Sequence, residues 1–289
     1  MARVIPNTLT IAGVDPSGGA GSLADVKTIS ALGGYACAVI TALTAQNTRA
    51  VTAVLPIAPA FVGEQIDTLL SDVHIDATKI GMVGRAPVIE MVADRLAHWS
   101  VAPVVLDPVM VAKSGDPLLD KSAVSALREA LLPLATILTP NLPEAGVLLG
   151  ERSAETLKEM YRAAEKLRKL MRSDGARWIL LKGGHLPGSE ATDLLYDGDR
   201  MIELNAARVD THNTHGTGCT LSAALATLLA RTQDVPQAAR VAKAYLTNAL
   251  ARGDELAVGK GHGPVHHFHA LWQTGDGGIP FDPDGAKRR

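Results

Sequence analysis

The sequence is poor in cysteine and aromatic residues, and it has no long uncharged hydrophobic run. Its two cysteines, Cys37 and Cys219, are too few for the disulfide framework of a small secreted domain, so we expect both to be reduced thiols. A membrane-spanning helix needs about 18 or more apolar residues, and a secretory signal needs an apolar N-terminal segment. Neither pattern occurs, and we expect a cytoplasmic protein that binds no membrane.

An excess of either charge is also lacking. The chain has 28 basic and 30 acidic residues, which give a formal net charge of −2. Nucleic-acid-binding proteins usually carry a strong basic excess, so we expect none as a partner. The 289 residues, 47% of them hydrophobic, are enough for one large α/β domain that acts on a small molecule. We assign that domain to residues 1–272 and interpret residues 273–289, rich in glycine and charge, as a flexible tail.

Apolar strands alternate with amphipathic helices along most of the chain. Residues 9–12, 23–32 and 35–40 form a β-α-β pattern whose helix ends at two glycines. We expect further helices over residues 59–70, 87–98, 122–131, 144–149, 154–171, 219–229 and 237–252. We expect further strands over residues 79–82, 104–106, 136–138, 178–181, 194–196 and 200–204. The last two surround Asp197-Gly198-Asp199, which predicts an antiparallel hairpin beside a mostly parallel sheet.

Polar or glycine-rich loops follow several of the predicted strands. They cover residues 13–21, 44–47, 107–110, 139–144 and 182–184. Ligands of open α/β sheets bind outside the carboxyl ends of the strands, so these loops predict one shared site. The first loop has neither the Gly-Lys-Ser/Thr ending of a Walker motif nor the spacing of a dinucleotide fingerprint.

A glycine-rich turn, residues 214–219, leads directly into an apolar helical run. The first N–H groups of a helix lack intrahelical partners, and with the helix dipole they attract phosphate. Cys219 lies at this helix start, where a thiol ionises more easily, so it is a candidate proton acceptor.

Nine segments together resemble the hydroxymethylpyrimidine and phosphomethylpyrimidine kinases of thiamine synthesis, within the ribokinase-like superfamily. The resemblance extends from about Thr8 to Trp272. The segments are AGVDPSGGAG (12–21), ITALTAQNT (40–48), TKIGM (78–82), VLDPVM (105–110), AKSGDPLL (112–119), TPNLPEA (139–145), LKGGH (181–185), THGTGCTLSAALA (214–226) and GPVHHFH (263–269). The resemblance implies a three-layer αβα fold with a mostly parallel central sheet and a small antiparallel element. It implies transfer of the ATP γ-phosphate to the pyrimidine hydroxymethyl group and then to the monophosphate.

The same resemblance implies roles for individual residues. It places the pyrimidine near Gly13, Asp25, Gln46, Met82 and Val109. An aminopyrimidine has an amine donor and ring-nitrogen acceptors, which Asp25 and Gln46 can match.

At the phosphate end, the resemblance assigns Asn141 and Lys182 to the nucleotide, and Asp107 and Glu144 to Mg²⁺. It assigns the phosphate cradle and proton acceptor to Gly216, Thr217, Gly218 and Cys219. A requirement for a monovalent cation stays open, and family members suggest a homodimer.

The residues by themselves leave three other functions open. A pyridoxal or pyridoxine kinase would act on a similar flat hydroxymethyl ring, although Asp25 and Gln46 favour the aminopyrimidine. A non-catalytic vitamin-binding protein would not need the set of glycines with Asn141, Glu144 and Lys182. A cysteine hydrolase using Cys219 would need a recognisable partner histidine signature. The histidines in residues 262–269 lack cysteine or carboxylate partners, and we interpret them as a packing motif.

Overall fold

A sheet of nine strands forms the centre of the molecule in the computed structural model, which describes residues 5–110, 121–172 and 174–272. The strand order is β3-β2-β1-β4-β5-β6-β7-β8-β9. The strands are β1 (Asn7–Val14), β2 (Tyr35–Gln46), β3 (Val51–Pro56), β4 (Ala77–Ile80), β5 (Val104–Leu106), β6 (Ile137–Leu138), β7 (Trp178–Leu181), β8 (Asp193–Tyr196) and β9 (Met201–Leu204).

The sheet is parallel in its middle and antiparallel at both edges. Strands β2, β1, β4, β5, β6 and β7 pair in parallel, whereas β8 and β9 form the expected hairpin. The second antiparallel edge was not predicted: β3 returns along β2 after a short turn at residues 47–50. Four of its six residues are exposed, so β3 lacks the half-buried alternation by which a sequence reveals a strand.

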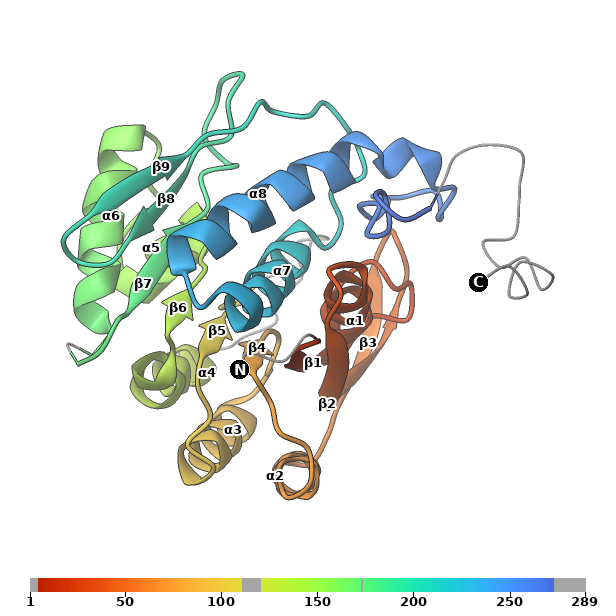
Figure 1. The fold of residues 1–289 in the computed structure, drawn as a ribbon, viewed down its shortest axis with the longest axis vertical. Coiled ribbons are helices and arrows are strands. Elements are labelled where there is room, and N and C mark those ends of the chain that lie inside the picture. The colour runs from red at the N-terminus through yellow and green to blue at the C-terminus, as the bar shows by residue number, and fades with distance from the viewer. Residues whose placement is uncertain (1–4, 111–120, 173, 273–289) are drawn as a thin grey trace, which may run out of the picture.

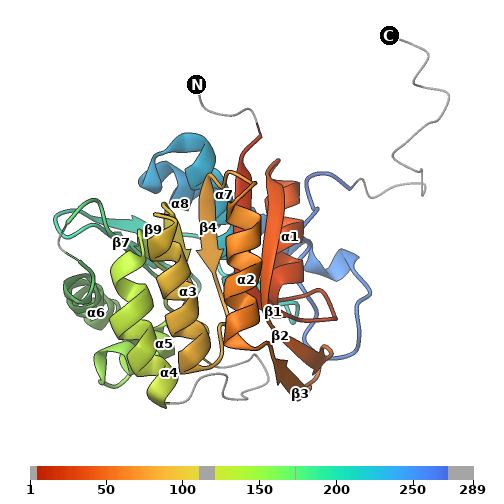
Figure 2. The same ribbon diagram turned by 90° about the horizontal axis from the view of Figure 1, so that it is seen from below.

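Helices cover both faces of the sheet. The helices are α1 (Gly21–Ala31), α2 (Pro59–Leu70), α3 (Ala86–His98), α4 (Lys121–Ala126), α5 (Leu142–Leu149), α6 (Leu157–Leu170), α7 (Thr217–Thr232) and α8 (Val235–Ala251). Figures 1 and 2 show α1, α7 and α8 on one face, with α2, α3 and α4 on the other. The expected helix over residues 122–131 is a short α4 that continues as a π-helical turn, Leu127–Leu131. This arrangement is the expected three-layer α/β fold.

Alternating side chains of the strands fill the two cores. In β5, Val104 and Leu106 pack against the layer of α2 to α6, whereas Val105 packs against α7 and α8. In β7, Ile179 faces the first layer and Trp178 the second. Because both faces are covered, these strands are apolar at every position, which is why sequence alone predicted them with their observed bounds.

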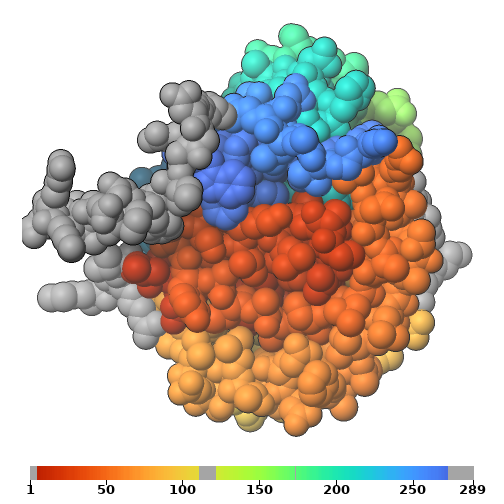
Figure 3. Space-filling view, turned by 90° about the vertical axis from the view of Figure 1, so that its right-hand side faces the viewer, coloured from red at the N-terminus to blue at the C-terminus, as the bar shows by residue number. Residues whose placement is uncertain are grey.

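The segment after α8 lies against the N-terminal third of the chain. Figure 3 shows it in blue, beside the red and orange surface. The His262 N–H donates to the carbonyl oxygen of Thr48 at 2.9 Å, and the His215 N–H donates to that of Gly263 at 3.0 Å. The proposed tail, residues 273–289, and the segment AKSGDPLL lie outside the described residues. Among the described helices, none is long and apolar enough to cross a bilayer.

Candidate functional site

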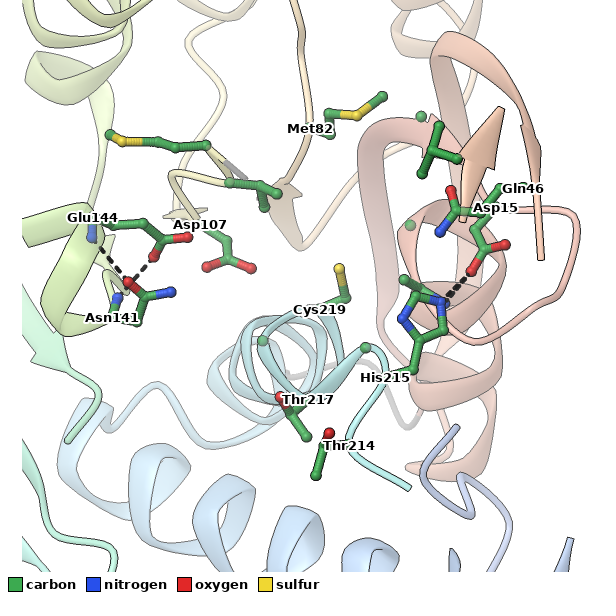
Figure 4. Close-up of a pocket in the computed structure, with 18 of the residues that line it drawn as sticks. Asp15, Gln46, Met82, Asp107, Asn141, Glu144, Thr214, His215, Thr217 and Cys219 are labelled. Atoms are coloured by element: carbon green, nitrogen blue, oxygen red, sulfur yellow. Dashed lines mark hydrogen bonds and ion pairs between the residues drawn. The ribbon is translucent and has the colours of Figure 1, made fainter. Parts of the chain in front are cut away.

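A cavity of about 470 Å³ opens at the carboxyl ends of the strands. Strands β2 and β3 lie on one side of β1 in the sheet, and the chain then crosses to β4 on the other side of β1. The order in which strands join the sheet therefore reverses beside β1. A crevice forms at such a reversal, where the two following loops diverge. The loops after β1, β4, β5, β6 and β7 and the start of α7 all contribute residues to the lining, as does Gln46 at the end of β2 (Figure 4). Residues of all five predicted loops therefore do share one site, although residues 44–46 belong to strand β2 and not to a loop.

The start of α7 forms one wall of the cavity. Gly216 precedes the helix with φ of 77°, and a Cβ atom there would lie 1.7 Å from the carbonyl oxygen of Gly19. Only glycine allows this close approach of the two loops. Thr217, Gly218 and Cys219 follow as the first turn and line the cavity, which is the arrangement that suits an anion.

The electrostatics of Cys219 differ from the expectation. Burial raises the pKa of its thiol to about 11, although the nearby Lys79 ammonium acts in the opposite direction. The helix N-terminus was expected to lower this pKa, and that expectation is wrong because loss of hydration has the larger effect. At neutral pH the protein without ligand therefore holds Cys219 as a neutral thiol.

Four of the five residues predicted to bind the pyrimidine line the cavity: Gly13, Gln46, Met82 and Val109. Figure 4 shows Gln46 and Met82 on the side of the cavity away from Glu144. A Cβ atom at Gly13 would lie 2.3 Å from Cε of Met82, so glycine is needed there for the methionine to pack as it does. The Gln46 side-chain oxygen accepts a hydrogen bond from the Thr44 hydroxyl at 3.1 Å. The amide nitrogen of Gln46 and the second lone pair of its side-chain oxygen can form hydrogen bonds with a ligand.

Asp25, the fifth residue, is not part of the cavity lining. Its side chain is fully buried, and Oδ2 accepts hydrogen bonds from Lys79 Nζ at 2.7 Å and from the Thr10 hydroxyl at 2.6 Å. Asp25 raises the pKa of Lys79, although burial acts against this. The other oxygen, Oδ1, has no hydrogen-bond partner among the described residues. A contact of Asp25 with a bound ring stays a prediction, and it would have to use Oδ1.

Lys79 is a residue that sequence reasoning missed. It lies in β4 with its side chain fully buried, although lysine is rarely buried unless it is paired. The only signal was a charged residue inside a short apolar strand, where the expected pattern is uninterrupted hydrophobicity.

The residues assigned to nucleotide and metal lie together at the opposite end of the cavity. Lys182 Nζ is 2.9 Å from Asp107 Oδ1 and 3.9 Å from Glu144 Oε2. Although burial by itself raises the pKa of Asp107, Lys182 and Lys79 hold it below the ordinary value. Burial raises the pKa of Glu144 to about 7, with Lys182 acting in the opposite direction.

Asn141 and Glu144 also begin α5. The Asn141 side chain accepts a hydrogen bond from the Glu144 N–H at 2.9 Å, and Glu144 accepts one from the Asn141 N–H at 2.7 Å (Figure 4). This reciprocal capping box fixes the Glu144 carboxylate at the helix start. Asn141 and Glu144 thus each have a structural role in capping the helix, in addition to the predicted roles in binding the nucleotide and magnesium.

The donor set at this end fits magnesium. Within the described part of the chain, no group of three or more histidine, cysteine or acidic residues could hold a metal. Magnesium keeps several waters and needs only one or two carboxylates, so Asp107 and Glu144 beside a phosphate chain are sufficient.

Asp15 and His215 form a second buried pair in the lining, and no local pattern in the sequence predicted that these two residues meet. The Asp15 carboxylate lies 2.6 Å from Nε2 of His215 and accepts a hydrogen bond from the Ala20 N–H at 3.0 Å (Figure 4). These contacts join the loop after β1 to the loop before α7. The sequence indicated these two residues only because each lies in one of the nine segments that carry the family resemblance.

Three of the four histidines in residues 262–269 pack inside the protein, whereas His262 is exposed, so the expected packing role is wrong for that residue. His266, His267 and His269 are all buried. Nε2 of His267 lies 3.2 Å from the Thr220 hydroxyl, which connects this segment to α7. Burial lowers the pKa of His267 to about 3, so it is neutral.

Comparisons with known proteins agree with this geometry. The phosphomethylpyrimidine kinase family matches residues 15–266. The chain is 53% identical to the hydroxymethylpyrimidine/phosphomethylpyrimidine kinase of Escherichia coli (strain K12), over 92% of this chain and 98% of that protein. The kinase of the same description from Rhizobium meliloti (strain 1021) has the same identity and coverage.

Two solved structures are similar in fold. An ADP complex of Bacillus subtilis pyridoxal kinase has a TM-score of 0.83 and 35% identity, covering 92% of this chain and 98% of that one. Phosphomethylpyrimidine kinase from Clostridium difficile 630 has a TM-score of 0.74 and 39% identity, covering 84% of this chain and 99% of that one.

Proposed function

The chain belongs to the phosphomethylpyrimidine kinase family, and we propose that its cavity phosphorylates hydroxymethylpyrimidine, and then the monophosphate, with ATP. The observation that carries this proposal is one cavity with Gln46 and Met82 at one end and Lys182 and Asp107 at the other. The start of α7 lies between the two ends, so a hydroxymethyl group and a γ-phosphate can meet there (Figure 4). Relatives that share 53% identity over nearly their whole length are named for both reactions.

On the pyrimidine side, we propose that Gln46 pairs with the aminopyrimidine edge while Met82 and Val109 contact the ring faces. Gln46→Ala should lower kcat/KM for the pyrimidine by about 1–3 kcal/mol of transition-state binding, because the ring loses a buried partner. The KM for ATP should stay unchanged, and initial-rate kinetics with each substrate varied measures both. Thr52→Ala, on the exposed face of β3, is the control. Equal losses for both substrates would mean that the pyrimidine lies elsewhere.

On the phosphate side, we propose that Asp107 and Glu144 hold Mg²⁺, and that Asn141 and Lys182 bind the nucleotide. Bound magnesium would neutralise phosphate charge. Lys182 would add a fixed positive charge, and the N–H groups of residues 216–219 would bind the oxygens of the transferred group. The P–O bond to ADP breaks as the substrate hydroxyl oxygen bonds to phosphorus. Because this transition state is loose, charge stabilisation matters more than early removal of the hydroxyl proton.

We propose that Cys219 accepts the proton of the substrate hydroxyl. The neutral thiol of the free enzyme must first release its own proton to solvent water, and the thiolate then accepts the hydroxyl proton. Lys79 and the first turn of α7 favour the thiolate, and a bound substrate excludes competing water.

The decisive experiment is mass spectrometry of products after incubation with MgATP. The substrates are hydroxymethylpyrimidine, its monophosphate and pyridoxal, each alone. Monophosphate and diphosphate of the pyrimidine should both form. Pyridoxal kinase is the second candidate, since solved pyridoxal kinases share this fold at 31–35% identity, and much faster phosphorylation of pyridoxal would replace our proposal.

The same experiment separates the other two alternatives. A vitamin-binding protein would give no phosphorylated product, and a cysteine hydrolase would consume neither ATP nor pyrimidine. We further propose that residues 1–272 act as one kinase domain and that two copies form a homodimer, supported by the exposed apolar side chains of Leu43 and Leu55.

A further inference from the structure

Residues 184–190, which follow Lys182, are folded around the side chain of Arg208. Its guanidinium group donates hydrogen bonds to four carbonyl oxygens of this loop. The acceptors are Gly184 at 2.9 Å, Leu186 at 2.6 Å, Gly188 at 2.9 Å and Glu190 at 3.3 Å. The Arg208 N–H also donates to the carbonyl oxygen of Ser189, at 2.8 Å. One side chain therefore forms hydrogen bonds with the backbone along the whole loop.

Other contacts of the loop include the turn onto Gly183 and the bridge between Glu190 and Ala207. Most of its residues are exposed, and two are glycines, so little apolar surface can be buried within it. A guanidinium carries five N–H donors in a rigid planar fork, which can reach several carbonyl oxygens at once. A lysine ammonium has three donors on one atom and cannot reproduce this pattern. The conformation of residues 184–190 consequently depends on arginine at position 208.

Of the residues of this loop, His185 lines the cavity, together with the neighbouring Lys182. The N–H of Leu186 donates to the carbonyl oxygen of Gly183 at 2.9 Å, so the chain turns immediately after Lys182. We infer that Arg208 is a positioning residue for the nucleotide: it holds residues 184–190 so that His185 forms part of the nucleotide end of the cavity.

The charge of Arg208 suits this role. Its donors bind neutral carbonyl oxygens, and none of the described ion pairs includes Arg208. Among the described ion pairs no acidic side chain therefore offsets the guanidinium charge, and the loop that Arg208 holds contributes His185 to the cavity end that carries Lys182. A polyanion such as a nucleoside triphosphate is attracted to such a region. The inference rests on the proposed function, because it assumes that ATP occupies the Lys182 end.

The first test compares Arg208→Lys with wild type in steady-state kinetics with MgATP and hydroxymethylpyrimidine. We expect the KM for ATP to rise roughly tenfold, because a change of that size corresponds to the loss of about one hydrogen bond to a charged ligand. The KM for the pyrimidine and kcat at saturating ATP should change less than about twofold. The control is Arg200→Lys, since Arg200 binds Asp197 at the β8–β9 turn, and it should leave all three constants unchanged. An unchanged KM for ATP in Arg208→Lys overturns the inference.

A second test asks whether Arg208 acts through His185. His185→Ala should raise the KM for ATP, and Arg208→Lys should add little to it in the double variant, because both changes remove the same contact. Hydrogen exchange of the amides of residues 184–190 should increase in Arg208→Lys but not in His185→Ala. Additive effects on the KM, or an unchanged KM in His185→Ala, overturn the inference, and the latter does so even if Arg208→Lys fails to fold.

Lys182→Ala separates this inference from the proposed function. If it raises the KM for ATP while Arg208→Lys does not, only the role of Arg208 is wrong. If wild-type protein forms no phosphorylated pyrimidine, or if Lys182→Ala leaves the KM for ATP unchanged, the proposed placement of ATP is wrong as well.

Discussion

The Cys219 thiol has two opposing influences, burial and the charge of Lys79, and its reactivity with iodoacetamide should reveal which is larger. Only the thiolate reacts, and the pKa is raised to about 11. We therefore expect the alkylation rate of the Cys219 peptide, followed by mass spectrometry, to rise about tenfold per pH unit from pH 7 to 10. A plateau below pH 8 would show instead that the charge of Lys79 and the helix N-terminus together outweigh burial.

Cys219→Ala tests the role of the same thiol in turnover. The N–H groups of the first turn remain in this variant, so substrate binding should be largely kept while kcat falls roughly 10²- to 10⁴-fold. Cys219→Asp should keep part of the activity, because a carboxylate can accept the same proton. Stopped assays of product formation measure both. Near wild-type kcat in a folded alanine variant would leave catalysis to the phosphate cradle and magnesium.

Glu144 should make the stability of the metal-free protein depend on pH. Its pKa is 4.5 in the ordinary case and about 7 in the folded protein. Between these values the folded state binds the proton and the unfolded state does not, so stability falls as pH rises through this window. Above pH 7 Glu144 is ionised in both the folded and the unfolded state. Its ionisation has then lowered the free energy of unfolding by about 3 kcal/mol.

The variant Glu144→Gln removes this titration but keeps an oxygen for the helix cap. Urea denaturation without magnesium should therefore show the variant gaining stability relative to wild type from pH 5 to 8. Glu165→Gln, at an exposed position of α6, is the control. A constant difference between Glu144→Gln and wild type across this range would contradict the raised pKa.

At the scale of elements, the Asp25–Lys79 ion pair connects α1 to β4 inside the protein. Removing one partner leaves a buried charge alone, which costs about 3–5 kcal/mol. Asp25→Asn should therefore lower the free energy of unfolding by that amount in urea denaturation. The double variant Asp25→Leu with Lys79→Met should recover most of the loss, because neither charge remains. A loss below about 1 kcal/mol in the single variant would mean that water reaches the pair.

At the scale of the whole molecule, the antiparallel edge formed by β2 and β3 is the surface on which we expect the second copy. Leu43 and Leu55 lie directly opposite each other on these strands and are 45% and 62% exposed. Such a cross-strand apolar pair is stabilised when another surface covers it. Leu55→Glu should convert a dimer to a monomer in sedimentation velocity, whereas Glu64→Gln, on α2, should not. A monomeric wild type at micromolar concentration would contradict the proposed dimer.

Local patterns in the sequence determined most of the fold. Strands β5 and β7 and helix α2 have the predicted bounds, because covered strands are apolar throughout and α2 begins at a proline. The glycine-rich turn before α7 was also predictable, since close backbone approach requires glycine whatever surrounds it. The loops that line the cavity followed from the rule that ligands bind at the carboxyl ends of strands.

Only the tertiary structure decided which groups meet in space and how strongly they are desolvated. Asp25 pairs with Lys79, which is 54 positions away in the sequence, and groups distant in the chain contribute to the pKa of the half-buried Cys219. Strand β3 pairs with the edge of β2, and its own residues lack the half-buried alternation that predicts a strand. Pairing and dehydration depend on atoms that are distant in sequence, so no local pattern records them.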